Sequence, residues 1–332
     1  MHRRSYRRCA FAAVVTAALV LSATQIVLAQ RTTTLRLPHC CAVDSHFDVG
    51  AKRFAELVAE YSGGAIQVEV FPGGQLGQET EVIQNVQQGI IELTLIGHDP
   101  LAQFAPITTI LSLPYLFDDH DQAFALLEGQ LGVEIESQLA GRNLVVLGWG
   151  NNGARVYTNN RRPLETPADF RGLKFRSPQS PVNLAVTEAL GGIAVAIPYG
   201  EVYTALQQGT IEGQENAVIN IYPANLQEVQ SFMSMTHHLL SFTVLVANKG
   251  WLDGLPADQR AAVERAALEA MAFQRAHVVT LTDDLVARME AAGVIVNWPD
   301  LGAFREATRA VHDAYVGRSF SQDLYDLIRR AD

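Results

Sequence analysis

Residues 81–92 read EVIQNVQQGIIE, and residues 201–212 read EVYTALQQGTIE. Seven of the twelve positions are identical, at an offset of 120 residues. Each copy predicts a helix that ends at a glycine (Gly89 or Gly209) and leads directly into a strand. Two common helix-to-strand joins can look alike by chance. The alternative, which we favour, is a pair of lobes built on related βαβ units. Two such lobes leave a crevice at the carboxyl ends of their strands, where ligands bind in parallel sheets.

The sequence around the repeat alternates apolar runs with amphipathic helical stretches, which is typical of an α/β fold built from parallel βαβ units. The predicted strands are Leu35–Cys40, Ile66–Phe71, Leu93–Gly97, Leu144–Trp149, Lys174–Arg176 and Ile193–Ile197. The predicted helices between them are Phe47–Tyr61, Glu79–Gln88, Gln122–Leu127, Pro181–Leu190 and Val202–Gln208.

A much longer helix is predicted from Pro256 to Ala292, with proline in its first turn and Gly293 after its end. Such a helix is roughly 50 Å long, which is longer than one lobe. We expect it to lie across both lobes; a dimerising helix is the alternative. We assign residues 30–152 and 242–281 to the first lobe, and residues 153–241 and 282–332 to the second.

The N-terminal segment has the form of a secretory signal peptide. Four arginines fall within the first eight residues, no charge follows from Cys9 to Gln30, and Val27-Leu28-Ala29 offers small residues for cleavage before Gln30. An uncleaved membrane anchor is the alternative, because the uncharged run is nearly long enough to span a bilayer. We predict that residues 1–29 are removed on export to the periplasm.

Charge and cysteine content narrow the possible partners. Loss of residues 1–29 removes four arginines and no acid, which leaves 21 basic and 35 acidic side chains and a net charge of −14. Such a surface repels nucleic acid and anionic lipid. The only cysteines after the leader are the adjacent Cys40 and Cys41, so no disulfide framework is expected and both are taken as free thiols.

Three polar residues are candidates for a ligand site. Arg176 ends a short apolar strand, where a guanidinium can bind a carboxylate through two parallel hydrogen bonds. Arg155 lies where the chain leaves the first lobe, and Asn216 follows the second copy of the repeat. The alternative for Arg176 is a surface residue paired with a nearby carboxylate.

Catalytic and metal-binding patterns are missing from the sequence. It has no Gly-x-Ser-x-Gly elbow, phosphate-binding loop or dinucleotide fingerprint. The spacing of His39, Cys40, Cys41 and His46 fits no standard zinc pattern. We therefore expect no enzymatic activity, no cofactor and no metal.

Five motifs together resemble the DctP-type solute-binding subunit of tripartite ATP-independent periplasmic (TRAP) transporters, in order and over about residues 34–320. They are Phe71-Pro72-Gly73-Gly74-Gln75-Leu76-Gly77, Leu113-Pro114-Tyr115-Leu116-Phe117, Arg155-Val156-Tyr157-Thr158-Asn159, Thr166-Pro167-Ala168-Asp169-Phe170-Arg171-Gly172-Leu173-Lys174-Phe175-Arg176, and residues 201–216.

The resemblance implies a two-lobed periplasmic binding-protein fold of the type II kind, with the ligand between the lobes. Arg176 matches the arginine that holds the ligand carboxylate, Arg155 a second arginine that assists, and Asn216 an asparagine of the same pocket. The resemblance places four further regions near the ligand, represented by Tyr199, by His39 with Cys40, by His98 and by Gln179.

The implied partners are a small organic-acid anion and the membrane subunits of a TRAP transporter, with a monomer as the default state. Residues 220–230 favour a C4-dicarboxylate, while sugar acids and other hydroxy or keto acids remain open. A sensory receptor for a membrane kinase, an ABC transporter partner and a periplasmic enzyme for organic acids are the alternatives.

Overall fold

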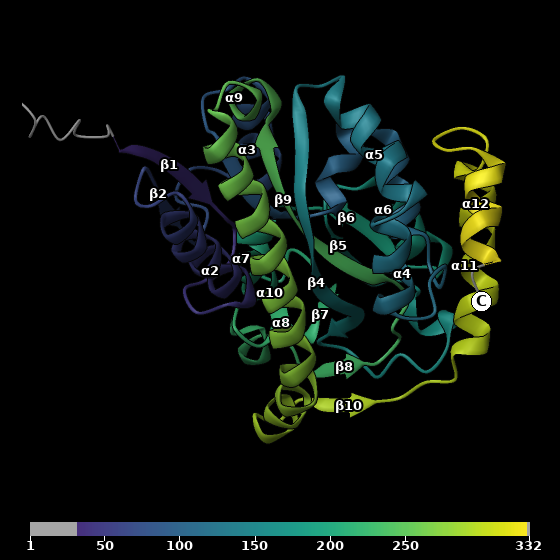
Figure 1. Ribbon diagram of the computed structural model, residues 1–332. Helices are drawn as coiled ribbons and strands as arrows, with labels where there is room; N and C mark the ends of the chain where they lie inside the picture. Colours follow the sequence, from purple (N-terminus) through teal and green to yellow (C-terminus); the bar gives the residue numbers. More distant parts are fainter. Residues whose placement is uncertain (1–31, 331–332) are drawn as a thin grey trace, which may run out of the picture. The chain divides into compact units, whose positions relative to one another are not determined.

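The computed structural model describes residues 32–330, and the chain from Thr34 onward packs as one unit. Its strands are β1 Thr33–Pro38, β2 Ile66–Phe71, β3 Leu93–Gly97, β4 Leu144–Asn159, β5 Lys174–Ser177, β6 Ile193–Ala196, β7 Gly213–Ala217, β8 Phe232–Ser234, β9 Leu240–Asn248 and β10 Ile295–Asn297. Its α-helices are α2 His46–Tyr61, α3 Glu79–Gln87, α4 His120–Leu127, α5 Gln130–Ala140, α6 Pro181–Ala189, α7 Val202–Gln207, α8 Val218–Ile221, α9 Lys249–Asp253, α10 Ala257–Ala291, α11 Leu301–Tyr315 and α12 Gln322–Arg329 (Figure 1). Short 3-10 helices are η1 Asp99–Gln103, η2 Pro106–Ser112, η3 Pro167–Phe170, η4 Tyr199–Glu201 and η5 Leu226–Glu228.

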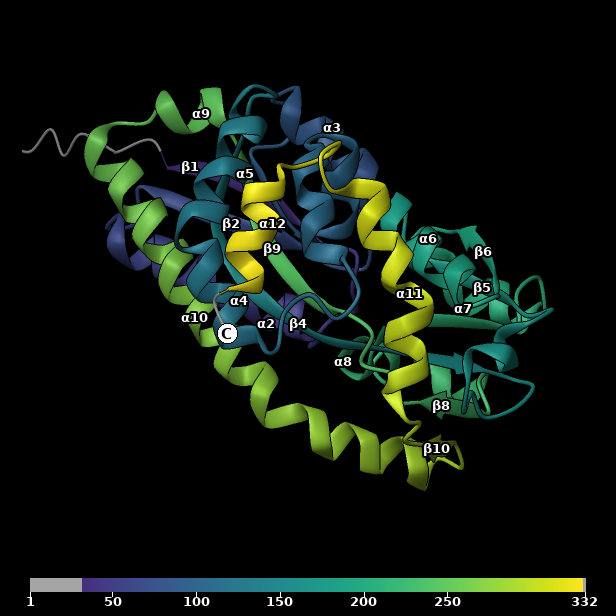
Figure 2. The ribbon, with the colours of Figure 1, turned by 90° about the vertical axis from the view of Figure 1, so that its right-hand side faces the viewer.

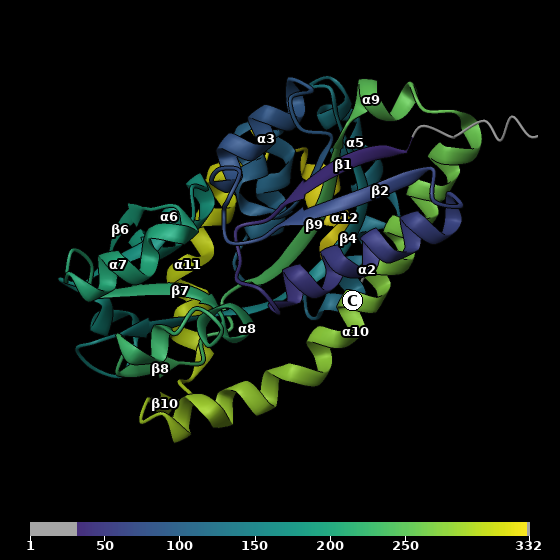
Figure 3. The same ribbon diagram turned by 90° about the vertical axis from the view of Figure 1, so that its left-hand side faces the viewer.

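The strand β4 is shared by two groups of elements. Its first half pairs with β9, which pairs with β3, and its second half pairs with β7 and β8. We call β1, β2, β3, β9 and the first half of β4, with α2 to α5 and α9, the first lobe. The second half of β4, β5 to β8 and β10, with α6 to α8, form the second lobe. Figure 3 shows β1, β2 and α2 on one side and β6 and β7 on the other.

The α/β class predicted from the sequence is confirmed, but the expected all-parallel pairing is wrong. β4 runs antiparallel to β7, β8 and β9, and β3 runs antiparallel to β9. Among the strands of the second lobe, β5 pairs parallel with β6 and with β7, and β10 pairs parallel with β8. Because β9 follows β4 by some eighty residues, its pairing with β4 left no local signal in the sequence.

The internal repeat corresponds to equivalent places in the two lobes. α3 leads into β3, and α7 leads into β7, through turns at Gly89 and Gly209 with φ of 74° and 68°. Each of these strands then pairs antiparallel with one of the two long strands, β3 with β9 and β7 with β4. The repeat therefore marks a construction shared by both lobes.

β4 continues ten residues beyond its predicted end at Trp149. It is interrupted by irregularities between Val146 and Gly148 and between Asn151 and Ala154, and it reaches the second lobe through Gly153. Gly153 has φ of 78°, and a Cβ there would lie 2.7 Å from the Cβ of Ala217. Glycine is required at this crossing both for the backbone conformation and for the close approach of β7.

The helix α10 packs against both lobes, as predicted (Figure 2). Its 35 residues correspond to about 50 Å. Val263, Ala267 and Ala270 lie in the apolar core of the first lobe, and Val278, Leu285 and Met289 lie in that of the second. A third core, beneath α4, α5, α6 and α11, includes residues of both lobes.

Gln274 fixes α10 to the point where β4 crosses between the lobes. Its buried side-chain amide accepts a hydrogen bond from the Asn151 N–H at 2.8 Å and donates one to the Asn151 carbonyl at 2.6 Å. A Cβ at Gly150 would lie 2.4 Å from the Gln274 Oε1, so glycine is needed for this contact.

Within residues 32–330, no helix combines the length and apolar character needed to cross a membrane. The predicted signal peptide lies outside the described residues.

Candidate ligand-binding site

A cavity lies between the two lobes, and the space in it that a water-sized sphere can occupy is about 30 Å³. The first lobe, the crossing strand β4 and the second lobe all contribute to it. The lining residues are Cys40, Cys41, Phe47, Glu79, Gly97, Asp99, Asn152, Arg155, Arg176, Pro178, Tyr199, Asn216 and Asn220.

Of the two arginines that line this cavity, Arg176 is the one without a counterion within 4.0 Å among residues 32–330. It belongs to β5, and only 2% of its surface is exposed. Its Nε donates a hydrogen bond to the Ile197 carbonyl at 2.8 Å, which fixes the guanidinium plane. No carboxylate of residues 32–330 lies within 4.0 Å of its nitrogen atoms. Burial, and then the positive charge of Arg155, lower the pKa of Arg176. A buried charge without a partner is costly, so this site favours an anion.

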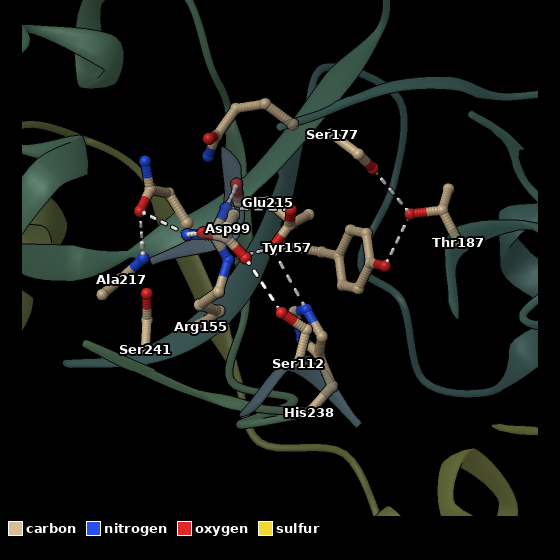
Figure 4. A network of polar contacts seen from close by, with 12 residues as sticks. Asp99, Ser112, Arg155, Tyr157, Ser177, Thr187, Glu215, Ala217, His238 and Ser241 are labelled. Carbon is tan, nitrogen blue, oxygen red and sulfur yellow. Dashed lines mark hydrogen bonds and ion pairs between the residues drawn. The ribbon is translucent and has the colours of Figure 1, made fainter. Parts of the chain in front are cut away.

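Arg155, in contrast, is already paired. Its Nη2 donates to Glu215 Oε1 at 2.9 Å and to the Glu215 carbonyl at 2.8 Å, and its Nε donates to Glu215 Oε2 (Figure 4). Burial opposes both charges, but the attraction of Glu215 raises the pKa of Arg155, and Arg155 and His238 lower the pKa of Glu215. Arg155 lies inside β4 and not at a strand end, which corrects our expectation from the sequence.

A second polar chain leads to Asp99 from behind the cavity. The backbone N–H of Phe242 donates to His98 Nδ1 at 3.2 Å, so the proton of the neutral ring is on Nε2, which is 3.0 Å from Ser112 Oγ. Ser112 then donates to Asp99 Oδ1 at 3.3 Å (Figure 4). Asp99 Oδ2 lies 3.7 Å from Arg155 Nη1. These contacts hold the Asp99 carboxylate at the cavity wall.

Three asparagines are joined by hydrogen bonds along one wall. Asn220 Nδ2 donates to Asn152 Oδ1 at 2.8 Å and to Asn216 Oδ1 at 3.0 Å. Asn216 Oδ1 also accepts from Arg155 Nη1 and from the Ala217 N–H. Because this oxygen accepts three hydrogen bonds, the orientation of the Asn216 amide is fixed. The Asn216 NH₂ group is then a donor for a ligand oxygen.

Glu79 provides a carboxyl group on the first-lobe side. It begins α3, and its Oε1 accepts a hydrogen bond from the Gly97 N–H at 2.8 Å. Burial raises the pKa of the Glu79 carboxyl; the hydrogen bond from Gly97 opposes this shift, and the negative charge of Asp99 adds to it. The cavity therefore has acceptors for ligand hydroxyl groups facing the first lobe, in addition to the cation from the second.

The structure brings five of the eight residues predicted from the sequence to this cavity, namely Arg176, Arg155, Asn216, Tyr199 and Cys40. The ring of Tyr199 is centred 6.0 Å from the Arg176 guanidinium carbon, and its hydroxyl donates to the Asn220 carbonyl at 2.8 Å. Cys40 follows the end of β1, with its Sγ 3.4 Å from that of Cys41.

The other three predicted residues do not line the cavity. His39 is buried beside Asp48, with 3.4 Å between its Nε2 and Oδ1 of the carboxylate. His98 lies behind the wall, in the chain that ends at Asp99. Gln179 instead joins the lobes outside the cavity: its Oε1 accepts from Thr80 Oγ1 at 3.0 Å, and its carbonyl accepts from Gln103 Nε2 at 3.0 Å.

Sequence reasoning missed several lining residues. Asn220 begins the segment 220–230 noted in the sequence, and Asn152 lies three residues before Arg155, but an isolated asparagine gives no sign that it belongs to a series. Glu79 and Asp99 each begin a helix, where an acidic residue is common because it interacts favourably with the helix dipole. Only the packing of the two lobes shows that these carboxyl groups face a cavity.

Known proteins resemble this chain over most of its length. The profile of the family described as bacterial extracellular solute-binding protein, family 7 (DctP), matches residues 39–318. The 2,3-diketo-L-gulonate-binding periplasmic protein YiaO of Escherichia coli is 35% identical over 81% of this chain and 82% of its own length. The C4-dicarboxylate-binding periplasmic protein DctP of Rhodobacter capsulatus is 31% identical over 86% of both chains. A TRAP periplasmic solute-binding protein from Roseobacter denitrificans, solved with bound β-D-glucuronate, has a TM-score of 0.87 and 30% identity over 90% of this chain and 100% of its own.

Proposed function

The chain belongs to bacterial extracellular solute-binding protein family 7, the DctP family of TRAP transporters, and from this premise we propose that it binds a hydroxylated monocarboxylate of the sugar-acid class. It would deliver this anion to the membrane subunits of a TRAP transporter. The observation that carries the proposal is the buried Arg176 guanidinium, which lacks a counterion among residues 32–330 and faces a cavity.

The charges around the cavity favour one ligand carboxylate over two. Arg155 is held by Glu215, so a single cation remains for the ligand. The first-lobe wall carries Glu79 and Asp99, which repel a second carboxylate and accept hydrogen bonds from hydroxyl groups. Diketogulonate and glucuronate, named for two of the similar proteins, are both oxygen-rich monocarboxylates. A C4-dicarboxylate is the alternative, favoured by the similarity to the Rhodobacter protein.

Binding would be strengthened by closure of the lobes, because removal of water increases the interaction between a guanidinium and a carboxylate. The hydrogen bonds of Gln179 to Thr80 and Gln103 already join the lobes beside the cavity. A neutral analogue would leave Arg176 unpaired in the closed cavity and would be rejected for that reason.

The test is thermal unfolding of residues 30–332 with a panel of D-glucuronate, D-galactonate, D-erythronate, succinate, L-malate and D-glucuronamide. A compound at one hundred times its Kd stabilises the folded protein by about 2.7 kcal/mol, which raises Tm measurably. We expect a rise with at least one sugar acid and none with the amide. Stabilisation by neutral compounds alone would overturn the role of Arg176, and stabilisation by succinate or malate alone would overturn the sugar-acid class.

A matched variant tests the first-lobe wall separately. Glu79→Gln keeps the size of the side chain but removes its charge, so the ratio of succinate affinity to sugar-acid affinity should rise about tenfold. An unchanged ratio in isothermal titration would show that Glu79 does not select against a second carboxylate.

A further inference from the structure

Two adjacent thiols form part of the cavity wall. The Sγ atoms of Cys40 and Cys41 are 3.4 Å apart, and both residues are free cysteines. Cys40 is half-buried and Cys41 is 3% exposed. The remaining cysteine of the sequence, Cys9, lies in the predicted leader, so a chain that begins at Gln30 has this pair alone.

The backbone around the pair is held in place by a glycine turn. The Cys41 carbonyl accepts a hydrogen bond from the Gly73 N–H at 2.7 Å, and the His39 carbonyl accepts one from the Gly74 N–H at 3.0 Å. Gly73 and Gly74 have φ of 66° and 72°, a conformation that other residues rarely adopt. Because β1 and this turn fix the main chain, the two thiols remain in contact with each other and with the cavity.

We propose that Cys40 and Cys41 are a thiol–disulfide modification site, and that their oxidation to a vicinal disulfide weakens ligand binding. This inference rests on the function proposed above, since it concerns regulation of the same cavity. The oxidant is a disulfide, either of a small thiol or of a protein. One cysteine thiolate attacks it and releases a first thiol, and the second cysteine then attacks the mixed disulfide and releases another. One S–S bond breaks in the oxidant, one forms in the protein, and the two thiol protons leave with the two released thiols.

A bond between these two sulfurs is easily reversed. Neighbouring Cα atoms are about 3.8 Å apart across a trans peptide, which is closer than the 4.4 Å or more of ordinary disulfides. The resulting strain makes the bond more reducible, as in labile and regulatory disulfides. The family to which the chain belongs is extracellular, where disulfides form and persist. The pair therefore has the properties of a switch and not of a structural cross-link.

Oxidation would alter the wall where the ligand binds. Cys40 and Glu79 line the same cavity. The hydrogen bond between its thiol and that of Cys41, followed by burial, raises the pKa of Cys40, with a smaller contribution from the charge of Glu79, so this group is a neutral thiol in the closed cavity. A disulfide removes that thiol and draws the Cys40 sulfur toward Cys41. By reciprocity, a bound ligand must then disfavour oxidation.

The experiment uses residues 30–332, first reduced and then exposed to graded ratios of reduced to oxidised glutathione. Intact mass and thiol titration follow the chemistry without any ligand. We expect loss of both thiols and of two hydrogen atoms per chain, without dimers or a lasting glutathione adduct, and full reversal by dithiothreitol. Persistent thiols or a stable mixed disulfide would overturn the proposal.

The effect on binding is measured with the sugar acid of the panel above that raises Tm most. We expect at least tenfold weaker binding by the oxidised protein, recovery after reduction, and slower oxidation at saturating acid. Equal affinity in both states would also overturn the proposal. The double variant Cys40→Ser/Cys41→Ser provides the control, because residues 30–332 then contain no thiol to oxidise and the affinity should not depend on the glutathione ratio. If no acid binds, the proposed function is wrong. The thiol titration and the intact mass still show whether Cys40 and Cys41 form a reversible disulfide, because both are measured without ligand.

Discussion

At the scale of the single residue, the proposed function makes ligand affinity depend on how the charge of Arg176 is balanced. Its guanidinium is buried and, among residues 32–330, hydrogen-bonded through Nε alone, which leaves its two Nη groups free to donate to a carboxylate. We expect Arg176→Ala to weaken binding of the preferred acid by about 2–5 kcal/mol, which is roughly 30-fold or more in Kd. Arg176→Lys should not restore binding, because an ammonium lacks the planar fork.

Isothermal titration measures both variants. Arg161→Ala is the matched control, since the side chain of Arg161 is 60% exposed and pairs with Glu212 on the surface. Near-normal affinity of either Arg176 variant would show that the carboxylate binds elsewhere.

His46 is a second residue whose burial has a measurable consequence. It is 3% exposed, and neither ring nitrogen has a hydrogen-bond partner among the described residues. Burial, and then the charges of His277 and His39, lower its pKa to about 3. Because the folded-state pKa is below the unfolded value near 6.5, the unfolded chain binds the proton more tightly. Stability is therefore complete above about pH 6.5 and is lost as the pH falls toward 3.

The His46 contribution is about 2 kcal/mol of unfolding free energy at pH 5 relative to pH 7. In His46→Leu, the loss of stability between these two pH values should be smaller by that amount. Urea unfolding of both proteins at pH 7 and pH 5 provides the four values needed. Equal losses in the two proteins would mean that His46 is protonated in the folded state.

At the scale of elements, Gln179 joins the loop after β5 to α3 and η1. We had expected it at the ligand, but its bonds to Thr80 and Gln103 make it a contact between lobes. Gln179→Ala should raise the dissociation rate of every bound acid by a similar factor, about 2–10-fold, since a hydrogen bond is worth roughly 0.5–1.5 kcal/mol. Stopped-flow release measures this, with the exposed Gln208→Ala as control. A change in the order of preference among acids would instead indicate direct contact with the ligand.

The elements themselves were predictable where the signal is local. The repeat predicted α3, α7 and the strands that follow them, and the proline and glycine that flank α10 predicted its ends to within one residue. The second half of β4 was missed because Gly148, Gly150 and residues 151–153 read as a turn. In the structure Gly148 and Gly150 lie beneath α10, and Gln274 satisfies the backbone of Asn151. The second half of β4 is therefore stabilised by tertiary packing against α10, and a local sequence pattern cannot predict such packing.

The residues of the candidate site divide in the same way, into those with a local signal in the sequence and those brought to the cavity by tertiary packing. Arg176 and Asn216 stand next to recognisable turns and strand ends, so both the pattern and the family resemblance pointed to them, whereas Tyr199 was predicted from the resemblance alone. Glu79 and Asp99 reach the cavity through the packing of the two lobes. The sequence therefore predicted the arginine that we propose for a ligand carboxylate, but not the acidic side chains that, in the same proposal, select against a second carboxylate.

At the scale of the whole molecule, the surface opposes the ligand that the cavity attracts. The chain after residue 29 has a net charge of −14, while the cavity offers one unpaired guanidinium. The field of the surface extends over a Debye length, about 30 Å at 0.01 M salt and 8 Å at 0.15 M, whereas the buried guanidinium is screened much less. Salt should therefore weaken the repulsion on approach more than it weakens the final contact.

We accordingly expect the association rate constant of the preferred acid to rise about threefold between 0.01 M and 0.15 M salt, with little change in its dissociation rate. A variant with Glu60, Glu306 and Asp313 changed to lysine has a net charge six units less negative, and its rate should depend less on salt. These three side chains are exposed and do not line the cavity. Stopped-flow fluorescence at four salt concentrations measures the association rate constant of both proteins. A rate constant that falls with salt would mean that the cations of the cavity, and not the acidic surface, govern the approach of the anion.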